Sequence, residues 1–207
     1  MDINNGQSME QTILEVAERL FLEKGFAMTS TTEIAKEVGC NQALIHYYYR
    51  TKDNLFNVIF EQKFQALFKG LFEMKSMGDL KFQDKLRIII ESHYDLLMKN
   101  PKIPTLMLNE LTRQPDQIRI LREKLRALPE ELFKELNVDL QDEIKLGNVR
   151  EVSLTDLLIS VLSLNVAIFI MMPFVEKVLQ LSEAQKEALI AHRKAENVEF
   201  ILRSIRP

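Results

Sequence analysis

Several residue types are scarce in this chain of 207 residues. It has one cysteine, no tryptophan, three histidines, six glycines and six prolines. A single cysteine, Cys40, excludes an internal disulfide and a cysteine-rich zinc site, and it suits a reducing cytoplasm. So few glycines and prolines leave little material for the many tight turns of a β-sandwich or barrel. Long helices are therefore expected.

Positive charge is also in short supply. The chain has 27 lysines and arginines against 30 aspartates and glutamates, a net charge of −3, whereas nucleic-acid binding usually leaves a basic footprint. The first five residues, Met-Asp-Ile-Asn-Asn, lack the basic-then-apolar layout of a signal peptide, so we expect a cytoplasmic protein. Hydrophobic residues make up 46% of the chain, which is enough for a full core.

One apolar stretch is long enough to raise the question of a membrane span. No charged residue occurs from Leu157 to Val175, and a spanning helix needs about 20 apolar residues. However, Ser160, Ser163 and Asn165 interrupt the stretch, and Pro173 lies near its end. We therefore expect a buried helix of a soluble dimer, with no membrane partner.

The hydrophobic pattern is helical throughout, and no segment alternates with period two, so the chain is predicted to be all-α. Three capping boxes, Ser8 to Gln11, Ser30 to Glu33 and Ser182 to Gln185, mark helix starts. Gly25 and Gly39 are expected helix ends. Helices are predicted from residue 8 to 25, from 30 to 39, over Gln42–Tyr49, from Thr51 to about 75, over Phe82–Lys99, over Thr105–Thr112, from Asp116 with a kink at Pro129, over Thr155–Met172, and from Ser182 to about Arg203.

The first helices predict a DNA-reading unit. Two short helices around the tight turn at Val38-Gly39-Cys40, after a supporting helix, have helix-turn-helix geometry. The leading side chains of the second helix would meet base edges in the major groove. Asn41 and Gln42 carry amide groups that can pair with an adenine edge, and Ala43 could meet a thymine methyl group. Cys40 is interpreted as a small turn residue and not a redox sensor, because no second cysteine exists.

The other predicted contacts are to phosphates and to exposed base edges. Tyrosine hydroxyls, a lysine and the N–H groups at helix starts would hold phosphates. Residues 1–52 carry a net charge of −2, but residues 38–52 contain Arg50 and Lys52 and no acid. The predicted DNA-binding residues are Ser30, Thr31, Thr32, Asn41, Gln42, Ala43, His46, Tyr47, Tyr48, Thr51 and Lys52.

The stretch from Ile13 to Phe56 resembles the DNA-binding domain of the TetR family of bacterial transcription regulators. The residues that carry the resemblance are Ala17-Glu18-Arg19-Leu20-Phe21, Gly25-Phe26, Thr29-Ser30, Ile34-Ala35, Val38-Gly39, Ile45-His46-Tyr47-Tyr48-Tyr49 and Lys52-Asp53-Asn54-Leu55-Phe56. The resemblance implies a helix-turn-helix domain over 8–52, a linking helix over 52–75, and a regulatory domain over 76–207. By the same resemblance, the regulatory domain holds a ligand cavity and dimerises through its last two long helices.

Candidate effector and dimer residues lie in this second part. His93 is either a core histidine or an effector contact, and Asn165 belongs either to a ligand cavity or to a dimer seam. Methionines could line an adaptable pocket or fill a core. The effector candidates are His93, Met98, Met107, Asn165 and Phe169. A ridge of small residues on the last helix, which favours close approach of another helix, consists of Ala184, Ala188, Ala191, Ala195 and Val198.

These observations favour a regulator over an enzyme. The sequence has no glycine-rich phosphate loop, no metal-spaced cluster and no nucleophile–base pair, so neither catalysis nor a cofactor is expected. We expect a homodimer that binds a palindromic double-stranded DNA operator and is released by an unidentified small molecule, apolar or amphipathic in character. The alternative, motivated by the net acidity, is a helical dimer of the same fold that binds a ligand or a protein but not DNA.

Overall fold

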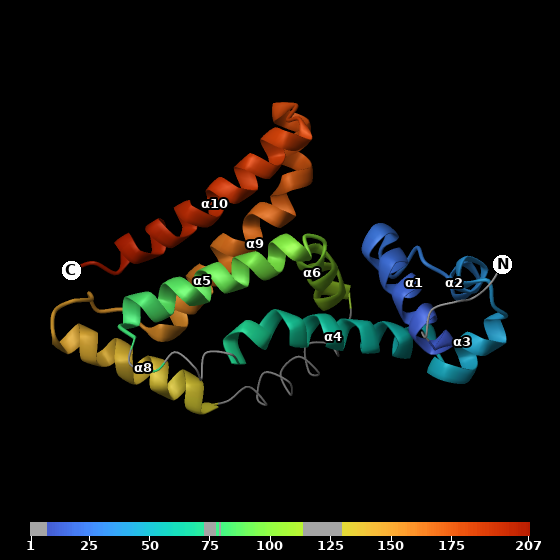
Figure 1. Cartoon of the computed structure of the whole chain (residues 1–207), viewed down its shortest axis with the longest axis horizontal. Helices are drawn as coiled ribbons and strands as arrows, with labels where there is room; N and C mark the ends of the chain where they lie inside the picture. The colour runs from blue at the N-terminus through green and yellow to red at the C-terminus, as the bar shows by residue number, and fades with distance from the viewer. Residues whose placement is uncertain (1–7, 73–77, 79, 114–129) are drawn as a thin grey trace.

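A computed structural model describes residues 8–72, 78, 80–113 and 130–207, and over these residues the chain is helical with no strand (Figure 1). The all-α prediction is thus confirmed. The helices form a small bundle at the N-terminal end and a larger one at the C-terminal end, joined by a long helix. Their bounds are α1 (Met9–Lys24), α2 (Thr31–Val38), α3 (Gln42–Tyr49), α4 (Lys52–Phe72), α5 (Phe82–Lys99), α6 (Ile103–Arg113), α8 (Glu130–Lys145), α9 (Leu154–Leu179) and α10 (Glu183–Ser204).

The small bundle packs α1, α2, α3 and the start of α4 around one apolar cluster. Apolar residues recur every three or four positions along α1, so they share one face and are buried together. Three rings lie at the centre: Phe21, Phe26 and Phe56, whose centroids are 5.0 to 5.6 Å apart. Burying each such side chain contributes about 1.5–3 kcal/mol, so this cluster holds the short helices in place.

Side-chain caps begin most of these helices where the sequence predicts. Ser8 Oγ accepts from the backbone N–H of Gln11, and Ser30 Oγ accepts from that of Glu33. The full reciprocal capping box forms only at Ser182. The side chains of Gln11 and Glu33 turn elsewhere, to Glu15 and to Lys24, so the first two boxes are half formed.

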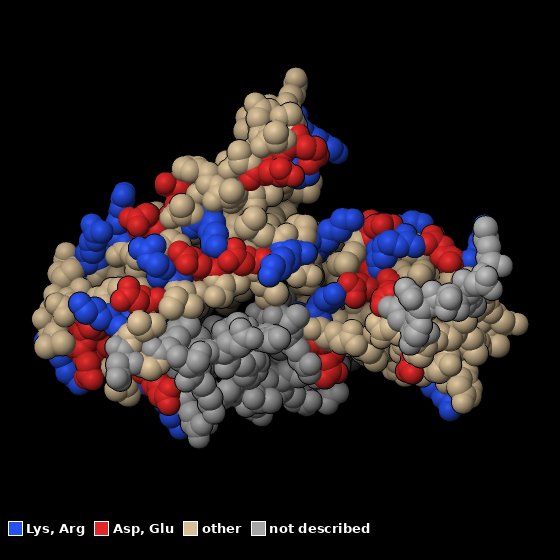
Figure 2. All heavy atoms as spheres, in the orientation of Figure 1, with Lys and Arg blue, Asp and Glu red and all other residues tan. Residues whose placement is uncertain are grey.

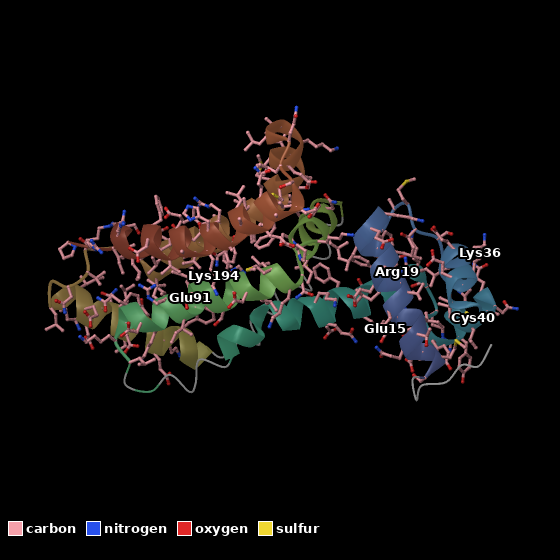
Figure 3. The ribbon with its side chains drawn as sticks, turned by 45° about the horizontal axis from the view of Figure 1, so that its top comes forward. Glu15, Arg19, Lys36, Cys40, Glu91 and Lys194 are labelled. Carbon is pink, nitrogen blue, oxygen red and sulfur yellow. The ribbon has the colours of Figure 1, made fainter. Side chains whose placement is uncertain are left out.

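The larger bundle is built around α5, which contacts α4, α8, α9 and α10 (Figure 1). Leu86, Ile89 and Ile90 form a buried stripe on α5 that packs against apolar residues of α8, α9 and α10. The exposed edge between α5 and α10 carries ion pairs, among them Lys194 Nζ to Asp95 Oδ1 at 2.6 Å. Figure 3 shows Lys194 and Glu91 along this edge.

Two predicted helix boundaries are wrong. The helix expected over Thr105–Thr112 begins at Ile103, because Pro104 falls in its first turn, where no helical N–H bond is needed. The helix expected to end at Met172 continues through Pro173 to Leu179. Its end is set by Gln180, which adopts a left-handed conformation with φ of +50°. The predicted end of the linking helix near residue 75, and the predicted helix from Asp116 to its kink at Pro129, lie outside the described residues.

Within the described part of the chain, α9 is the one helix long and apolar enough to cross a membrane. It contacts α5, α6, α8 and α10, yet its apolar residues are not all covered. Ile159, Phe174 and Val178 are 56%, 61% and 58% exposed. This protomer therefore leaves an apolar strip of α9 uncovered.

Two helices connect the bundles. α4 contacts α1 and α3 near its start and α5 further along. α6 contacts both α1 and α9, and Leu106 near its start is 5% exposed within the apolar cluster of the N-terminal bundle. The C-terminal part of the chain thus contributes a side chain to the core of the N-terminal part.

Candidate nucleic-acid interface

A left-handed glycine sets the turn before α3. Gly39 has φ of +76° and ψ of +29°, and its N–H bonds to the carbonyls of Ala35 and Lys36. Glycine adopts this conformation without strain, so it ends α2 and redirects the chain. α3 then packs by two buried residues, Ile45 and Tyr49. Burial raises the pKa of Tyr49 to about 12, so its hydroxyl stays protonated and donates to the carbonyl of Glu10 at 3.1 Å.

The opposite face of α3 is open to solvent. Ala43, His46 and Tyr47 are exposed, and the ring of Tyr47 is 70% exposed. Tyr48 is 36% exposed and stands edge-on to Tyr47, with centroids 5.2 Å apart and planes at 80°. These side chains form a surface of one methyl, one imidazole and two phenol groups on one short helix, as the sequence predicts.

The two amide groups at the start of α3 differ in their contacts. Asn41 Oδ1 accepts from the N–H of Ala43 at 2.9 Å, so Asn41 caps its own helix. Gln42 reaches across to α2, where Nε2 donates to Thr31 Oγ1 at 2.8 Å and Oε1 accepts from Thr32 Oγ1 at 3.3 Å. Gln42, Thr31 and Thr32 thus connect the first turns of α2 and α3, whereas Asn41 bonds only within its own helix.

The end of α3 is closed by His46. Its Nδ1 lies 2.9 Å from the carbonyl oxygen of Arg50, and because a carbonyl can only accept, Nδ1 carries a proton. Arg50 has φ of +65°, in the left-handed region that non-glycine residues rarely adopt. The ring of His46, which the sequence predicts to touch DNA, therefore holds the turn between α3 and α4. Its other nitrogen, Nε2, takes no part in this bond.

Thr51 and Lys52 are both engaged within the bundle. Thr51 Oγ1 accepts from the N–H of Asn54 at 3.0 Å and caps α4. Lys52 Nζ donates to the carbonyls of Phe26 and Thr29, both at 2.9 Å, and lies 4.0 Å from the centroid of the Phe26 ring. Lys52 thus ties the loop before α2 to the start of α4. Its predicted phosphate contact stays a prediction, and it competes with these bonds.

Much of the acidic charge near α3 is paired. Arg19 on α1 forms an ion pair with Glu37 on α2, and Lys24 pairs with Glu33. These contacts raise the pKa of Lys24 and lower that of Glu33. Arg19 lies between α1 and α2 in Figure 3, and in Figure 2 the α3 end of the molecule is mostly uncharged on the face shown. These pairs leave the net charge of residues 1–52 at −2, but they lie on α1 and α2, and residues 38–52 contain no acid.

One residue that the sequence-based site omitted lies in the interface. Arg50 is exposed in the turn that follows α3, and arginine is one of the side chains that most often contact phosphates. Arg50 and Lys52 are the two basic residues between positions 38 and 52, but the predicted DNA-binding residues include only Lys52. In the structure Arg50 is better placed than Lys52 for a phosphate contact, because Arg50 is exposed and the Lys52 ammonium group is bonded within the protein.

The turn before α3 also contains Cys40, the single cysteine of the chain. Burial raises the pKa of the Cys40 thiol, which lowers its thiolate fraction and its reactivity. Across the residues that the structure describes, no group of three or more histidine, cysteine, aspartate or glutamate side chains could hold a metal ion.

The predicted effector residues divide into separate places. His93 and Asn165 meet in a buried network: Asn165 Nδ2 donates to the Ile90 carbonyl at 2.9 Å and lies 3.1 Å from His93 Nδ1, and its Oδ1 accepts from Asn197 Nδ2 at 3.0 Å. Arg193 donates to Asn197 Oδ1 at 2.7 Å. Asn165 is fully buried, and its amide bonds within the protomer, across α5, α9 and α10. Burial lowers the pKa of His93 to about 4, so the ring is neutral at pH 7.

The remaining candidates are scattered. Phe169 is buried against Tyr94, with centroids 5.3 Å apart, and Met98 is 42% exposed. Met107 packs against the core of the N-terminal bundle, away from His93. On α10 the predicted small-residue ridge is exposed at Ala184, Ala188, Ala191 and Ala195. Val198 does not belong to it, because it is 1% exposed within the protomer's own core.

Comparison with known proteins is consistent with this geometry. A family model described as bacterial regulatory proteins, tetR family, matches residues 13–59. The HTH-type transcriptional regulator AcrR of Shigella flexneri is 42% identical over 55 residues, which cover 27% of this chain and 26% of that protein. The fatty acid metabolism regulator protein of Bacillus subtilis (strain 168) is 23% identical over 140 residues, 67% of this chain and 70% of that protein.

Solved structures share the whole fold. A regulatory protein in the tetR family from Rhodococcus RHA1 superimposes with a TM-score of 0.72 at 17% identity, covering 97% of this chain and 98% of that one. The TetR family regulator PfmR from Thermus thermophilus gives 0.66 at 22% identity, covering 95% and 97%. At such identities the likeness concerns the fold alone.

Proposed function

The chain belongs to the TetR family of bacterial transcription regulators, and from this premise we propose that it is a cytoplasmic homodimeric repressor, released from a palindromic operator by a small molecule. The exposed face of α3 carries the proposal. Only Ile45 and Tyr49 of this helix are buried, and the exposed side chains of Ala43, His46, Tyr47 and Tyr48 form a face that can enter a major groove. In a dimer, the two copies of α3 would sit about 34–36 Å apart and read two half-sites.

DNA binding is tested by a gel-shift of the purified full-length protein against the DNA upstream of its own gene. We expect a shift at low salt that a Tyr48→Ala variant weakens, because Tyr48 is exposed on α3 and its hydroxyl can reach a phosphate. Dimerisation should be unchanged in that variant. Absence of any shift for the wild-type protein would favour the alternative, a helical dimer that binds a ligand or a protein but not DNA.

A second copy is the proposed cover for the exposed strip of α9. Successive helix residues are about 100° apart, so one side of α9 carries Ile159, Ser163, Ala167, Ile170, Phe174 and Val178; we call it the α9 apolar face. All of these are exposed except Ile170, which is partly buried. An exposed apolar strip of this length usually marks an interface. We propose that this face, together with the exposed alanines of α10, packs on the same residues of another protomer.

Two phenylalanines of equal exposure provide a matched test. Phe174 lies in the α9 apolar face, whereas Phe200 lies about 160° around α10 from Ala184, and both are 61% exposed. In sedimentation velocity we expect Phe174→Asp to convert the dimer into a monomer and Phe200→Asp to leave it dimeric. A monomeric wild-type protein, or equal behaviour of the two variants, would refute the dimer surface.

The proposed effector is an apolar or amphipathic small molecule bound in the C-terminal bundle. That bundle contains a neutral histidine, His93, and aromatic residues such as Tyr94 and Phe169, but few free charges inside. The name of the B. subtilis relative, a fatty acid metabolism regulator, agrees with an effector of this kind. Binding would move α4 and α6, which connect the bundles, and so change the separation of the two α3 helices.

The effector proposal is tested on protein purified from its expression host. Native mass spectrometry followed by extraction into organic solvent should reveal an apolar molecule that leaves the protein on denaturation. Adding that molecule back should reduce the gel-shift, by about 5- to 150-fold in affinity for coupling of the usual size. An added molecule that binds without changing DNA affinity would contradict the proposed release.

A further inference from the structure

The side chain of Gln42 is held in place before any DNA is present. Its amide joins Thr31 Oγ1 at 2.8 Å and Thr32 Oγ1 at 3.3 Å. Gln42 is the first residue of α3, and the two threonines open α2. The two helix starts are thus connected by one amide group between two hydroxyls.

These contacts leave half of the amide's hydrogen-bonding capacity unused. A glutamine side chain has two N–H donors and two acceptor lone pairs on its oxygen. The threonines take one donor and one acceptor position, so one of each remains. The major-groove edge of adenine presents one acceptor, N7, and one donor, the N6 amino group. The unused N–H and the unused lone pair of Gln42 are thus the kinds of group that pair with N7 and the N6 amino group of adenine.

Asn41, the other amide at this end of α3, is placed differently. Its Oδ1 accepts from the N–H of Ala43 at 2.9 Å, so the side chain turns back to cap the helix. The orientation of the Asn41 amide is therefore set by its own helix, whereas that of the Gln42 amide is set by two hydroxyl groups of α2.

We propose that Gln42 is the base-reading amide of this protein and that Thr31 and Thr32 are positioning residues that hold it ready for an A·T pair in each half-site. The inference rests on the proposed function, since it requires α3 to enter the major groove. A free glutamine side chain loses rotamer freedom when it binds a base, and one already held loses less. The hydroxyl groups thereby increase discrimination between bases.

A positioning role differs measurably from the phosphate contact that the sequence alone suggested for these threonines. Loss of a phosphate contact weakens binding to all sequences alike. Loss of a positioning contact weakens binding to the preferred base pair more than binding to others, because only the preferred pair uses the held amide. The ratio of affinities for the operator and its single-base-pair variants therefore separates the two roles.

The experiment begins with selection of DNA from a randomised pool by the full-length wild-type protein. Dissociation constants for the selected operator and its single-base-pair variants are then compared for wild-type, Gln42→Ala, Thr31→Val, Thr32→Val and Thr32→Ser. Valine keeps the branched shape of threonine without the hydroxyl group, and serine keeps the hydroxyl group. Thermal melting confirms that each variant is folded. Thr31→Val removes the partner of Gln42 Nε2, and Thr32→Val removes the partner of Gln42 Oε1.

We expect Gln42→Ala to lose about 5- to 150-fold of discrimination at one A·T pair per half-site, the usual value of a bidentate base contact. Each valine variant should lose about 2- to 10-fold of the discrimination at the same pair. Thr32→Ser, which keeps the hydroxyl group, should discriminate as the wild type does. Equal weakening of all sequences by the valine variants, or a preference that survives in Gln42→Ala, would overturn the inference while leaving the proposed function standing. A wild-type protein that selects no sequence would refute the proposed function itself, and this inference with it.

Discussion

Replacing Lys52 by methionine separates two roles for the one lysine predicted to hold a phosphate. In the structure its ammonium group donates to two carbonyls, of Phe26 and Thr29, at 2.9 Å, and lies 4.0 Å from the ring centroid of Phe26. Methionine keeps the length of the side chain but loses these interactions. If the lysine serves to brace the loop, its loss reduces stability and not the number of phosphates neutralised.

The magnitude follows from the contacts. A hydrogen bond from a charged group contributes about 1.5–3 kcal/mol, and a cation–π contact about 0.5–1 kcal/mol at an accessible site. Because Lys52 is partly exposed, water compensates for part of the lost interactions, and we expect Lys52→Met to reduce the free energy of unfolding by about 2–3 kcal/mol. For a chain of this size that corresponds to a fall in Tm of roughly 4–12 °C.

The salt dependence of DNA binding provides the second measurement. Each neutralised phosphate contributes about −0.9 to the slope of log K against log salt concentration. We expect Lys52→Met to leave this slope unchanged at temperatures where the variant is folded. Arg50→Gln is the matched control, because its guanidinium is exposed beside α3: its slope should shrink by about 1.8 for a dimer, with little change in Tm. A reduced slope with an unchanged Tm in Lys52→Met would refute the bracing role.

Two further predictions concern the buried network of the C-terminal bundle. Asn165→Leu leaves Nδ2 of Asn197 and Nδ1 of His93 without their partner, so we expect a loss of about 2–4 kcal/mol; a loss in the double variant Asn165→Leu/Asn197→Leu that is smaller than the sum of the two single losses would agree, and full additivity would not. Second, His93 has a pKa of about 4 when folded against about 6.5 when unfolded; the unfolded chain therefore takes up this proton first as the pH falls. This difference should lower the free energy of unfolding by about 3 kcal/mol between pH 6.5 and 4. The His93→Gln variant should lack this decrease, and identical pH profiles of stability for the two proteins would contradict the prediction.

The sequence predicts the helices of the N-terminal bundle almost to the residue, because their signals are local. Ser30, Gly39 and Asn41 act within one turn of their own positions, as caps or as a left-handed stop. The exposed face of α3 also follows from the sequence, since a short amphipathic helix with Ile45 and Tyr49 on one side must present its other residues to solvent.

Other features depend on contacts between distant residues and could not be predicted this way. A lysine next to a recognition helix is consistent with both a phosphate contact and a brace, and only the position of the Phe26 carbonyl distinguishes them for Lys52. Val198 matched the spacing of the small-residue ridge, but the angle at which α10 meets α5 and α9 buries it. Asn165 was assigned either to a cavity or to a dimer seam, whereas the structure pairs it with Asn197, 32 residues later in the chain.

The placement of Leu106 implies that the DNA-reading head is not an independent folding unit. A fragment that stops at the end of α4 would contain α1, α2, α3 and α4 but would lack Leu106, one of the buried residues of the apolar cluster that holds these helices together. The two bundles should therefore melt in one transition, and the N-terminal bundle transferred alone onto another protein would have to carry α6 with it.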